Sequence, residues 1–331
     1  MNDKPIKFLF ISILSVLLLT SCEDDDSDTI PDRDFKQDMR DFVQGISSYS
    51  KGINSDFIII PQNGHDILTE DGEETGSPAA EYINAIDGVG REDLYYGYDN
   101  DNELTSTVDK DYMIAFMDIA ENNSVEVLVT DYCWTHSYMD DSYAQNANKG
   151  YISFAADHRE LDNIPDYPAT PYNMNADNIT SLSEANNFLY LLNPGTYSTE
   201  TTFLNAIQNT NYDLVIMDLF FEGTDELTFD DITSLKTKLN GGSRLIIAYM
   251  SIGEVEDYRY YWNSDWKNNP PSWLEKENPN WEGNYKVRYW DKELQDIIFG
   301  NNDSYLKKIL DAGFDGVYLD IIDAFEYFEG L

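Results

Sequence analysis

The chain has 331 residues, of which 62 are acidic and 21 are basic, so its formal net charge at pH 7 is −41. A charge of that sign and size repels nucleic acid and anionic lipid and favours cationic partners, so no nucleic-acid partner is expected. The three histidines show no spacing typical of a zinc site, and neither a metal nor a cofactor is predicted. We expect a monomer.

The first 21 residues are predicted to be a lipoprotein signal peptide. Lys4 and Lys7 precede an apolar run over residues 8–19, which is too short to remain as a membrane span, and Leu-Thr-Ser-Cys follows at 19–22. This ending resembles a bacterial lipobox, in which Cys22 would carry the lipid anchor. An ordinary cleaved signal peptide is the alternative.

An acidic run over residues 23–26 follows Cys22 directly. It resembles the surface-export signal of some Gram-negative lipoproteins, so we expect an outer-membrane lipoprotein at the cell surface rather than a periplasmic one. Membrane contact is then expected only through the Cys22 lipid. Residues 22–34 are interpreted as an acidic tether. With Cys22 lipidated, Cys133 has no partner for a disulfide within the chain.

Residues 35–331 are expected to form one barrel-sized domain. It begins with an amphipathic helix over 35–49. Beyond it, short runs rich in β-branched and aromatic residues alternate with longer amphipathic segments, which is typical of βα units and a parallel sheet. Strands are predicted at 57–60, 93–96, 125–130, 151–155, 188–192, 213–217, 244–250 and 316–319, and further helices at 111–120, 201–207, 230–239 and 303–310, with helix ends at Gly241 and Gly313.

Eight strands predict an α/β fold, a (β/α)8 TIM barrel in circularly permuted order. Strand 316–319 comes close to the end of the sequence, where no covering helix is expected, and helix 35–49 is the candidate to cover it. The chain termini would then meet between the last strand and the last helix. A doubly wound sheet is the alternative, but it would require a Gly-rich phosphate loop after an early strand, and the sequence has none.

Two long connections separate the predicted strands. Residues 157–187 are rich in Pro, Asn and Asp, which indicates a joint or linker. Residues 251–290 hold five of the six tryptophans. Two or three of these rings are expected to anchor the connection. One or two are expected to line a cleft, because tryptophan faces stack well on sugar rings.

Acidic side chains follow several of the predicted strands. Closure of a barrel would bring these strand ends together around one pocket. Paired carboxylates are what glycoside cleavage needs, one as the acid and the other as the nucleophile or base. Helix capping and ion pairing are the alternative roles for each residue. The strand-end residues are Asp131, Asp157, Asp218, Glu254, Glu256, Asp257, Asp320 and Asp323, with Gln62 and Asn63 as neutral groups after the first strand.

Three long motifs, IAYMSIGEVEDYRYYW at 247–262, WEGNYKVRYWD at 281–291 and GFDGVYLDIID at 313–323, resemble the endo-α-1,4-polygalactosaminidase family, glycoside hydrolase family 114, and its bacterial extracellular branch in particular. The resemblance implies hydrolysis of an α-linked, galactosamine-containing polysaccharide, a cationic polymer that suits the acidic rim. From the motifs and the rim together, Asp218, Glu254 and Asp320 are predicted to be catalytic. Asp218 is assigned as nucleophile or base, and Asp320 or Glu254 as acid.

The remaining predicted site residues are expected to bind substrate. Arg259 among them is interpreted as an orienting ion-pair partner rather than a substrate clamp. These residues are Gln62, Asn63, Asp131, Tyr249, Glu256, Asp257, Arg259, Trp290, Asp291, Tyr318 and Asp323.

The chain departs from the family pattern in two ways. Family members place the Pro-Gln-Asn-Gly strand after the strand that holds Asp320, whereas here residues 61–64 come first, which implies a circular permutation fused at 165–186. Tyr318 also stands where well-characterised members resemble Gly-Val-Glu, so Glu254 is a possible substitute. The alternative functions are a non-catalytic surface glycan-binding lipoprotein with a degenerate barrel, and a hydrolase of another polymer such as a host or capsular glycan.

Overall fold

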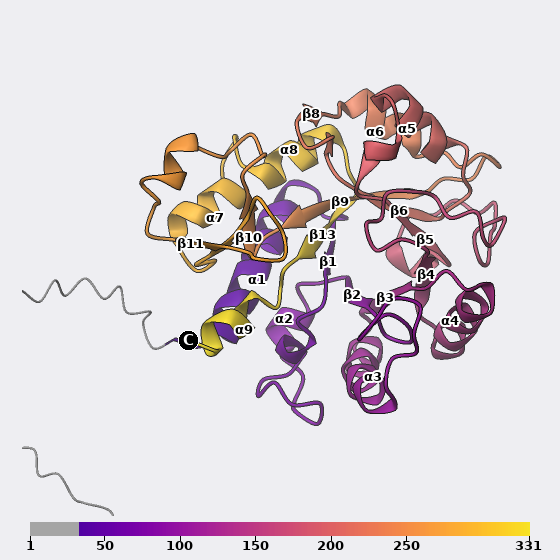
Figure 1. Cartoon of the computed structure of the whole chain (residues 1–331), viewed down its shortest axis with the longest axis horizontal. Helices are drawn as coiled ribbons and strands as arrows, with labels where there is room; N and C mark the ends of the chain where they lie inside the picture. The colour runs from indigo at the N-terminus through magenta and orange to yellow at the C-terminus, as the bar shows by residue number, and fades with distance from the viewer. Residues whose placement is uncertain (1–32) are drawn as a thin grey trace, which may run out of the picture. The chain divides into compact units, whose positions relative to one another are not determined.

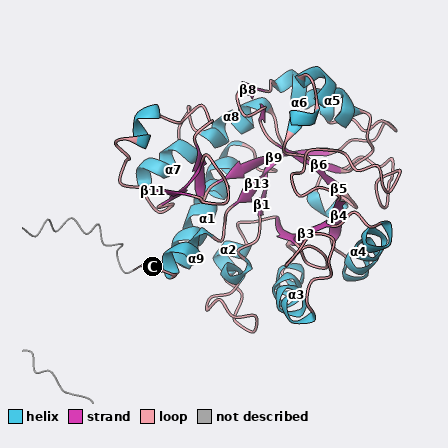
Figure 2. Cartoon of the chain, in the orientation of Figure 1, coloured by secondary structure: helices cyan, strands magenta, loops and turns pink. Residues whose placement is uncertain are grey.

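The computed structural model describes residues 33–331, a mixed α/β structure in which helices lie around a central set of parallel strands (Figures 1 and 2). The predicted signal peptide, the Cys22 anchor and nearly all of the acidic tether lie outside the described residues. None of the helices within 33–331 combines the length and the apolar character that a membrane span needs.

Five parallel strands form the larger sheet, in the order β5, β6, β9, β13, β1. Four of them follow chain order, but β1, the first strand of the chain, pairs with β13, the last, and Ile60 lies opposite Tyr318. The strands are β1 Ile58–Pro61, β5 Phe188–Tyr190, β6 Leu214–Met217, β9 Leu245–Ser251 and β13 Gly316–Asp320.

Three further parallel strands, β2 (Gly88–Glu92), β3 (Glu126–Tyr132) and β4 (Ile152–Ala156), form a second sheet in chain order. Just beyond β1, Gln62 makes a parallel bridge to Gly90 in β2. At the other side, β4 contacts β5, and the rings of Phe154 and Phe188 have centroids 5.7 Å apart. The two parallel sheets therefore contact each other at both edges, through β1 and β2 on one side and through β4 and β5 on the other.

Two small antiparallel sheets follow the carboxyl ends of β9 and β6. The first, in the Trp-rich connection, pairs β10 (Glu254–Glu256) with β12 (Asn284–Val287) and β12 with β11 (Leu274–Glu277). The second pairs β7 (Phe220–Phe221) with β8 (Asp225–Glu226). Both sheets come after strand ends, where site residues are expected.

Helices separate most of the parallel strands along the described chain (Figure 2). They are α1 Phe35–Ile53, α2 Ala80–Ile83, α3 Thr107–Asn122, α4 His136–Lys149, α5 Glu200–Gln208, α6 Phe229–Leu235, α7 Lys292–Ile298, α8 Tyr305–Ala312 and α9 Ala324–Glu329, with 3-10 turns at η1 His65–Leu68, η2 Leu182–Glu184, η3 Pro194–Thr196 and η4 Ser264–Lys267.

Helix α1 forms where its sequence predicts a helix. The Asp34 side chain caps its first turn by accepting a 2.9 Å hydrogen bond from the amide of Gln37. The apolar residues at helical spacing, Phe35, Met39, Phe42, Val43 and Ile46, are all buried. This face packs against α2, α8 and α9, so elements from both ends of the described chain meet on α1.

The predicted second strand is wrong in position. The ladder residues are Gly88–Glu92, and the chain turns away at Asp93, whose φ is 59°. Two glycines made this strand hard to recognise, because glycine is unfavourable in strands. Gly90 is required here by packing: a Cβ at this position would lie 2.0 Å from the hydroxyl oxygen of Tyr318.

Three helix predictions also need correction. Helix α4 is absent from the predicted set, because its buried face includes Ser142 and Asn146 and shows no apolar stripe. Helix α6 ends at Leu235 rather than near residue 239, and Gly241 lies in the turn that follows. Helix α9 does follow the last strand, although no helix was expected there. Gly313 ends α8 in the left-handed conformation, as predicted, with φ of 85°.

Candidate active site

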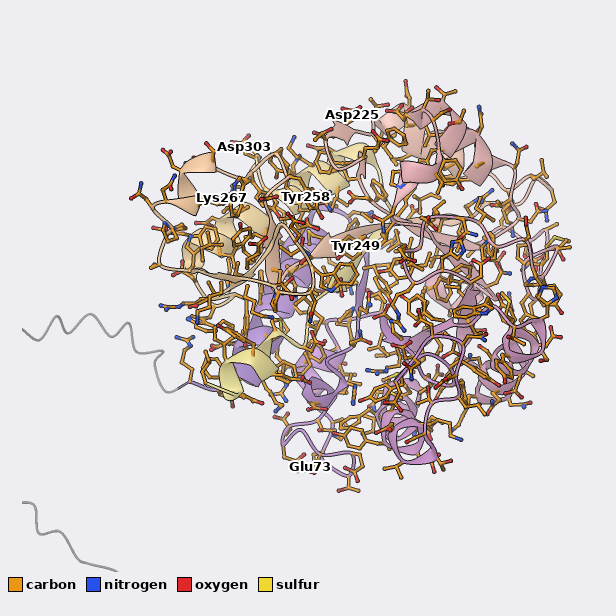
Figure 3. All side chains as sticks on the ribbon, viewed as in Figure 1. Glu73, Asp225, Tyr249, Tyr258, Lys267 and Asp303 are labelled. Atoms are coloured by element: carbon orange, nitrogen blue, oxygen red, sulfur yellow. The ribbon has the colours of Figure 1, made fainter. Side chains whose placement is uncertain are left out.

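A cavity of about 470 Å³ is lined by residues that follow the carboxyl ends of the strands. Parallel strands place these ends on the same side of a sheet, so side chains far apart in sequence meet there. Two of its tyrosines, Tyr249 on β9 and Tyr258 beyond β10, are labelled in Figure 3. Nine predicted site residues line the cavity: Gln62, Asn63, Asp218, Tyr249, Glu254, Glu256, Arg259, Asp320 and Asp323.

Asp320 ends β13 at the wall of the cavity. Its Oδ2 accepts a 2.6 Å hydrogen bond from the Tyr249 hydroxyl, and its Oδ1 accepts one of 2.8 Å from the amide of Ile321. Burial, reinforced by the negative charge of Glu92, raises the pKa of Asp320 to about 7. A substantial fraction of Asp320 therefore carries a proton at neutral pH, which suits a general acid.

The backbone beside Asp320 is strained. Ile321 lines the cavity and has a φ of 60°, a conformation that β-branched residues rarely adopt. Such a residue costs on the order of 1–3 kcal/mol, and strain of this kind is found most often at functional sites. The turn directs the Ile321 amide onto the Asp320 carboxylate.

Asp218 follows β6 and is engaged by Arg259. The two guanidinium Nη atoms donate to its two oxygens at 2.9 and 2.6 Å. Arg259 also donates to Glu256, and the amide of Phe220 donates to Asp218 at 2.9 Å. Bidentate pairing of this kind fixes a carboxylate in position. Arg259 is itself buried and forms ion pairs with both carboxylates, an arrangement compatible with the orienting role predicted for it.

Glu254 is almost completely buried at the edge of the cavity. Its Oε1 accepts from the Asn278 amide at 2.9 Å and lies 3.4 Å from the Lys286 ammonium. Its Oε2 has no hydrogen-bond partner among the described residues. Asp323, at the start of α9, also lines the cavity, and burial raises its pKa.

Several cavity residues were not recognised from the sequence. Glu92 ends β2, and its carboxylate accepts hydrogen bonds from the Tyr132 hydroxyl and from the Asn63 amide, the latter at 2.9 Å. The guanidinium of Arg159 stacks over the Tyr132 ring at 3.9 Å from its centroid. Placing the second strand at 88–92 would have put Glu92 at a strand end, so the misplaced strand concealed it. The cavity also includes Tyr190, whose hydroxyl donates to Gln62 at 3.0 Å.

Four predicted carboxylates lie outside the cavity lining, and one of them, Asp157, accepts from the Asn163 side-chain amide at 3.4 Å. Asp131 is fully buried, where it accepts hydrogen bonds from the Tyr95 amide at 2.8 Å and the Ser142 hydroxyl at 2.6 Å. Asp257 forms a 2.6 Å ion pair with Lys267. Asp291 caps the first turn of α7. These are the structural roles that strand-end carboxylates often have.

Two predicted aromatic residues also do not line the cavity. Trp290 packs against Phe35 and Phe328, with ring centroids 5.2 and 4.7 Å away. Tyr318 is fully buried below the cavity, against the ring of Tyr190. In place of Trp290, the cavity is lined by Trp281, which is 60% exposed.

The other tryptophans of the 251–290 connection pack on one another. Trp266 lies 5.2 Å from Trp262 and 5.0 Å from Trp273, measured between ring centroids. Trp273 is buried, so this group anchors the connection. No cluster of three or more His, Cys, Asp or Glu within residues 33–331 is arranged to hold a metal ion.

A cavity at the ends of parallel strands, lined by several carboxylates and aromatic rings, is the arrangement expected of a carbohydrate-cleaving enzyme. Residues 169–331 match the model of glycoside-hydrolase family GH114, so this part of the chain is similar to that family. The match includes Asp218, Glu254 and Asp320.

Three curated relatives are similar to part of the chain. An uncharacterized protein of Methanocaldococcus jannaschii is 43% identical over 54% of this chain and 49% of its own length. Uncharacterized proteins of Thermotoga maritima and Deinococcus radiodurans are each 39% identical, over 37% and 38% of this chain and 36% and 38% of their own lengths. The chain thus aligns with about half or less of each relative.

Proposed function

We propose that this protein is a glycoside hydrolase that cleaves an α-linked, galactosamine-containing polysaccharide with carboxylates of the described cavity. The observation that carries the proposal is Asp320, a carboxyl with a pKa near 7 in a cavity that other carboxylates line. The match of the 169–331 segment to a glycoside hydrolase family model supports the same reaction. Asp320 protonates the leaving glycosidic oxygen, and a second carboxylate attacks the anomeric carbon or activates water.

The charge of the cavity supports an amino-sugar substrate. Its carboxylates outnumber its two arginines, and both arginines are already paired: Arg259 with Asp218 and Glu256, and Arg159 with Asp93 and Asp101. The negative potential that remains attracts a cationic polymer. Trp281 offers an exposed ring at the same cavity for stacking on sugar.

A permuted (β/α)8 barrel is the architecture proposed for this function. The pairing order from β5 to β1, the bridge between Gln62 and Gly90, and the contact of β4 with β5 support a closed ring of eight strands. The family match begins at residue 169, within the Pro-rich connection. This start supports a fusion of former termini in that segment, with α1 and β1–β4 moved to the front of the chain.

Attachment at the cell surface completes the proposal. Cys22 would hold the lipid, residues 23–34 would act as a tether, and the enzyme would act on polymer outside the outer membrane. Release of the protein from membranes by detergent but not by salt, and its retention of a Cys22-linked lipid in mass spectrometry, would support this location. A mature protein that carries no lipid on Cys22 would contradict it.

The test of the reaction is release of new reducing ends from partly deacetylated galactosaminogalactan by the purified protein, with Asp320→Asn as the inactive control. Release from that polymer and not from fully acetylated material supports the cationic substrate. Release only from other glycans contradicts the galactosamine assignment but retains the hydrolase.

A second candidate function is a surface glycan-binding protein without catalysis. It is favoured by Tyr318, which is fully buried and stands where the family resemblance implies a glutamate. This function predicts that glycan binding, measured by calorimetry, occurs without turnover and is unchanged in Asp218→Asn and Asp320→Asn variants. Loss of turnover in those variants would exclude it.

A further inference from the structure

Glu92 faces the same cavity as Asp320 from a neighbouring part of the strand array. Along β2, Glu92 lies two residues beyond Gly90, so both point to the same side of the strand. Gly90 packs on the hydroxyl end of Tyr318, and Asp320 lies two residues beyond Tyr318 on β13. Glu92 and Asp320 therefore lie at equivalent positions on β2 and β13. Each comes two residues after one member of the buried contact between Gly90 and Tyr318.

The Glu92 carboxylate is held by neutral donors. The Asn63 side-chain Nδ2 donates to Oε2 of Glu92 at 2.9 Å, and the Asn63 side-chain Oδ1 accepts a 3.2 Å hydrogen bond from the backbone amide of Glu92. The Tyr132 hydroxyl donates to Oε1. Asn63 itself has a φ of 58°, a conformation that asparagine tolerates better than most residues. Two donors orient the carboxylate without neutralising its charge, and reactive carboxylates need to be held in this way.

Three other carboxylates of the cavity are less available than Glu92. Both oxygens of Asp218 accept from Arg259. Glu256 accepts from Arg259 and from the Tyr258 hydroxyl. Glu254 is buried beside Lys286. Asp218, Glu256 and Glu254 each have a cationic partner, whereas Glu92 has none in the ion pairs of the described residues.

The charge of Glu92 acts on Asp320. After burial, the charge of Glu92 is the largest influence that raises the pKa of Asp320, and it also raises that of Asp323. When the environments of two neighbouring carboxylates differ, one can serve as the acid and the other as the base or nucleophile.

We infer that Glu92 is the second catalytic carboxylate of this enzyme and acts on the opposite face of the sugar from Asp320. This assignment rests on the proposed hydrolase function. Glu92 supplies an electron pair, either by bonding to the anomeric carbon or by taking a proton from the water whose oxygen bonds there. The glycosidic C–O bond breaks at the same time, and its electron pair takes the proton of Asp320. In the first case water later replaces Glu92 at the anomeric carbon.

Chemical rescue of a Glu92→Ala variant tests the assignment. An aryl α-glycoside of a galactosamine oligomer is supplied with sodium azide. Loss of Glu92 lowers hydrolysis by about 100- to 10,000-fold. Azide then enters the vacated face and gives a glycosyl azide of inverted, β configuration. An α-azide would place Glu92 on the leaving-group side, and a folded variant without azide product would deny it a catalytic role. Either result overturns the inference.

A matched control separates a catalytic effect from a general one. Asp141 on α4 also accepts a tyrosine hydroxyl, that of Tyr96 at 2.8 Å, but it is exposed and does not line the cavity. Asp141→Asn should retain full activity. Tyr132→Phe, which keeps Glu92 but removes one of its donors, should lower kcat with little change in KM. If Tyr132→Phe raises KM alone, Tyr132 and Glu92 serve binding rather than catalysis.

A titration makes the inference testable apart from turnover. Carboxyl-labelled aspartate in the full chain is followed by ¹³C NMR, and the Asp320 signal is assigned by its loss in Asp320→Asn. In Glu92→Gln the Asp320 midpoint should move below its wild-type value, because a negative neighbour has been removed. If the wild-type protein cleaves no galactosamine polymer, the proposed substrate is wrong. The titration still tests whether Glu92 and Asp320 are electrostatically paired. An unmoved midpoint overturns the pairing, and a lowered midpoint supports it.

Discussion

The hydroxyl of Tyr249 donates a 2.6 Å hydrogen bond to Oδ2 of Asp320, across the paired strands β9 and β13. Tyr249 and Tyr318 lie opposite each other in that pairing. Asp320, two residues after Tyr318 on β13, accepts the hydrogen bond from the Tyr249 hydroxyl. The bond favours the ionised form of Asp320 and opposes the effect of burial. Tyr249 thus tunes the residue proposed as the acid.

The pH dependence of catalysis should report Asp320. The protonated form is the active one, so kcat/KM should fall as pH rises through about 7. Tyr249→Phe removes a hydrogen bond that lowers the pKa of Asp320, so this fall should move to higher pH. Tyr112→Phe is the matched control, because Tyr112 donates to Asp66 at 3.3 Å outside the cavity. A fall that moves to lower pH in Tyr249→Phe would contradict the assigned role.

Asp320→Asn should abolish activity and yet stabilise the fold at alkaline pH. The pKa of Asp320 rises from 3.8 to about 7 on folding, so the folded state binds the proton more tightly. Stability contributed by Asp320 is therefore present below about pH 4 and is lost as pH rises toward 7. At pH 8 the variant should gain on the order of 1–3 kcal/mol in urea unfolding, and at pH 4 the gain should vanish. Equal gains at both pH values would contradict this account.

Arg259→Met should destabilise the protein strongly. It leaves Asp218 and Glu256 without their shared cation in a buried site. Removing one partner of a buried ion pair lowers the free energy of unfolding by about 3–5 kcal/mol. Denaturant unfolding would measure this loss. Lys307→Met is the control, because its pairing with Asp311 is an i,i+4 surface pair worth about 0.3–0.5 kcal/mol. If Arg259→Met and Lys307→Met lose similar free energies of unfolding, the buried ion pairs of Arg259 do not stabilise the fold more than a surface pair does.

Helix α1 should be essential for folding. Removing residues 23–51 takes away its buried face, whereas removing 23–32 leaves it intact. The first deletion should give aggregated or unfolded protein, and the second should melt like the parent chain. Phe42→Ala should cost about 3–5 kcal/mol, against little for Ile53→Ala, whose side chain is 54% exposed. A chain starting at Gly52 that melts normally would exclude α1 as part of the fold and contradict the proposed permutation.

The alternation of strands and helices was predictable wherever the apolar pattern of an element shows its own period. Helix α1 has five apolar residues at helical spacing, and β6 and β9 are nearly continuous apolar runs. Strand β2 was not predictable, because Gly88 and Gly90 do not favour a strand in the local sequence. Only the ring of Tyr318, more than 200 positions away in sequence, explains why glycine stands at position 90.

The sequence by itself determined the similarity of the 169–331 segment to a glycoside hydrolase family and most of the carboxylates that line the cavity, because long motifs and strand-end positions are local properties. Which carboxylate is paired, buried or exposed was decided only by tertiary structure. Asp131 and Asp218 both follow strands, yet one is enclosed beneath α4 and the other faces the cavity on Arg259. Glu92 shows the reverse case: the donors that orient it, Asn63 and Tyr132, come from other strand ends, and a pKa depends on such neighbours in space rather than in sequence.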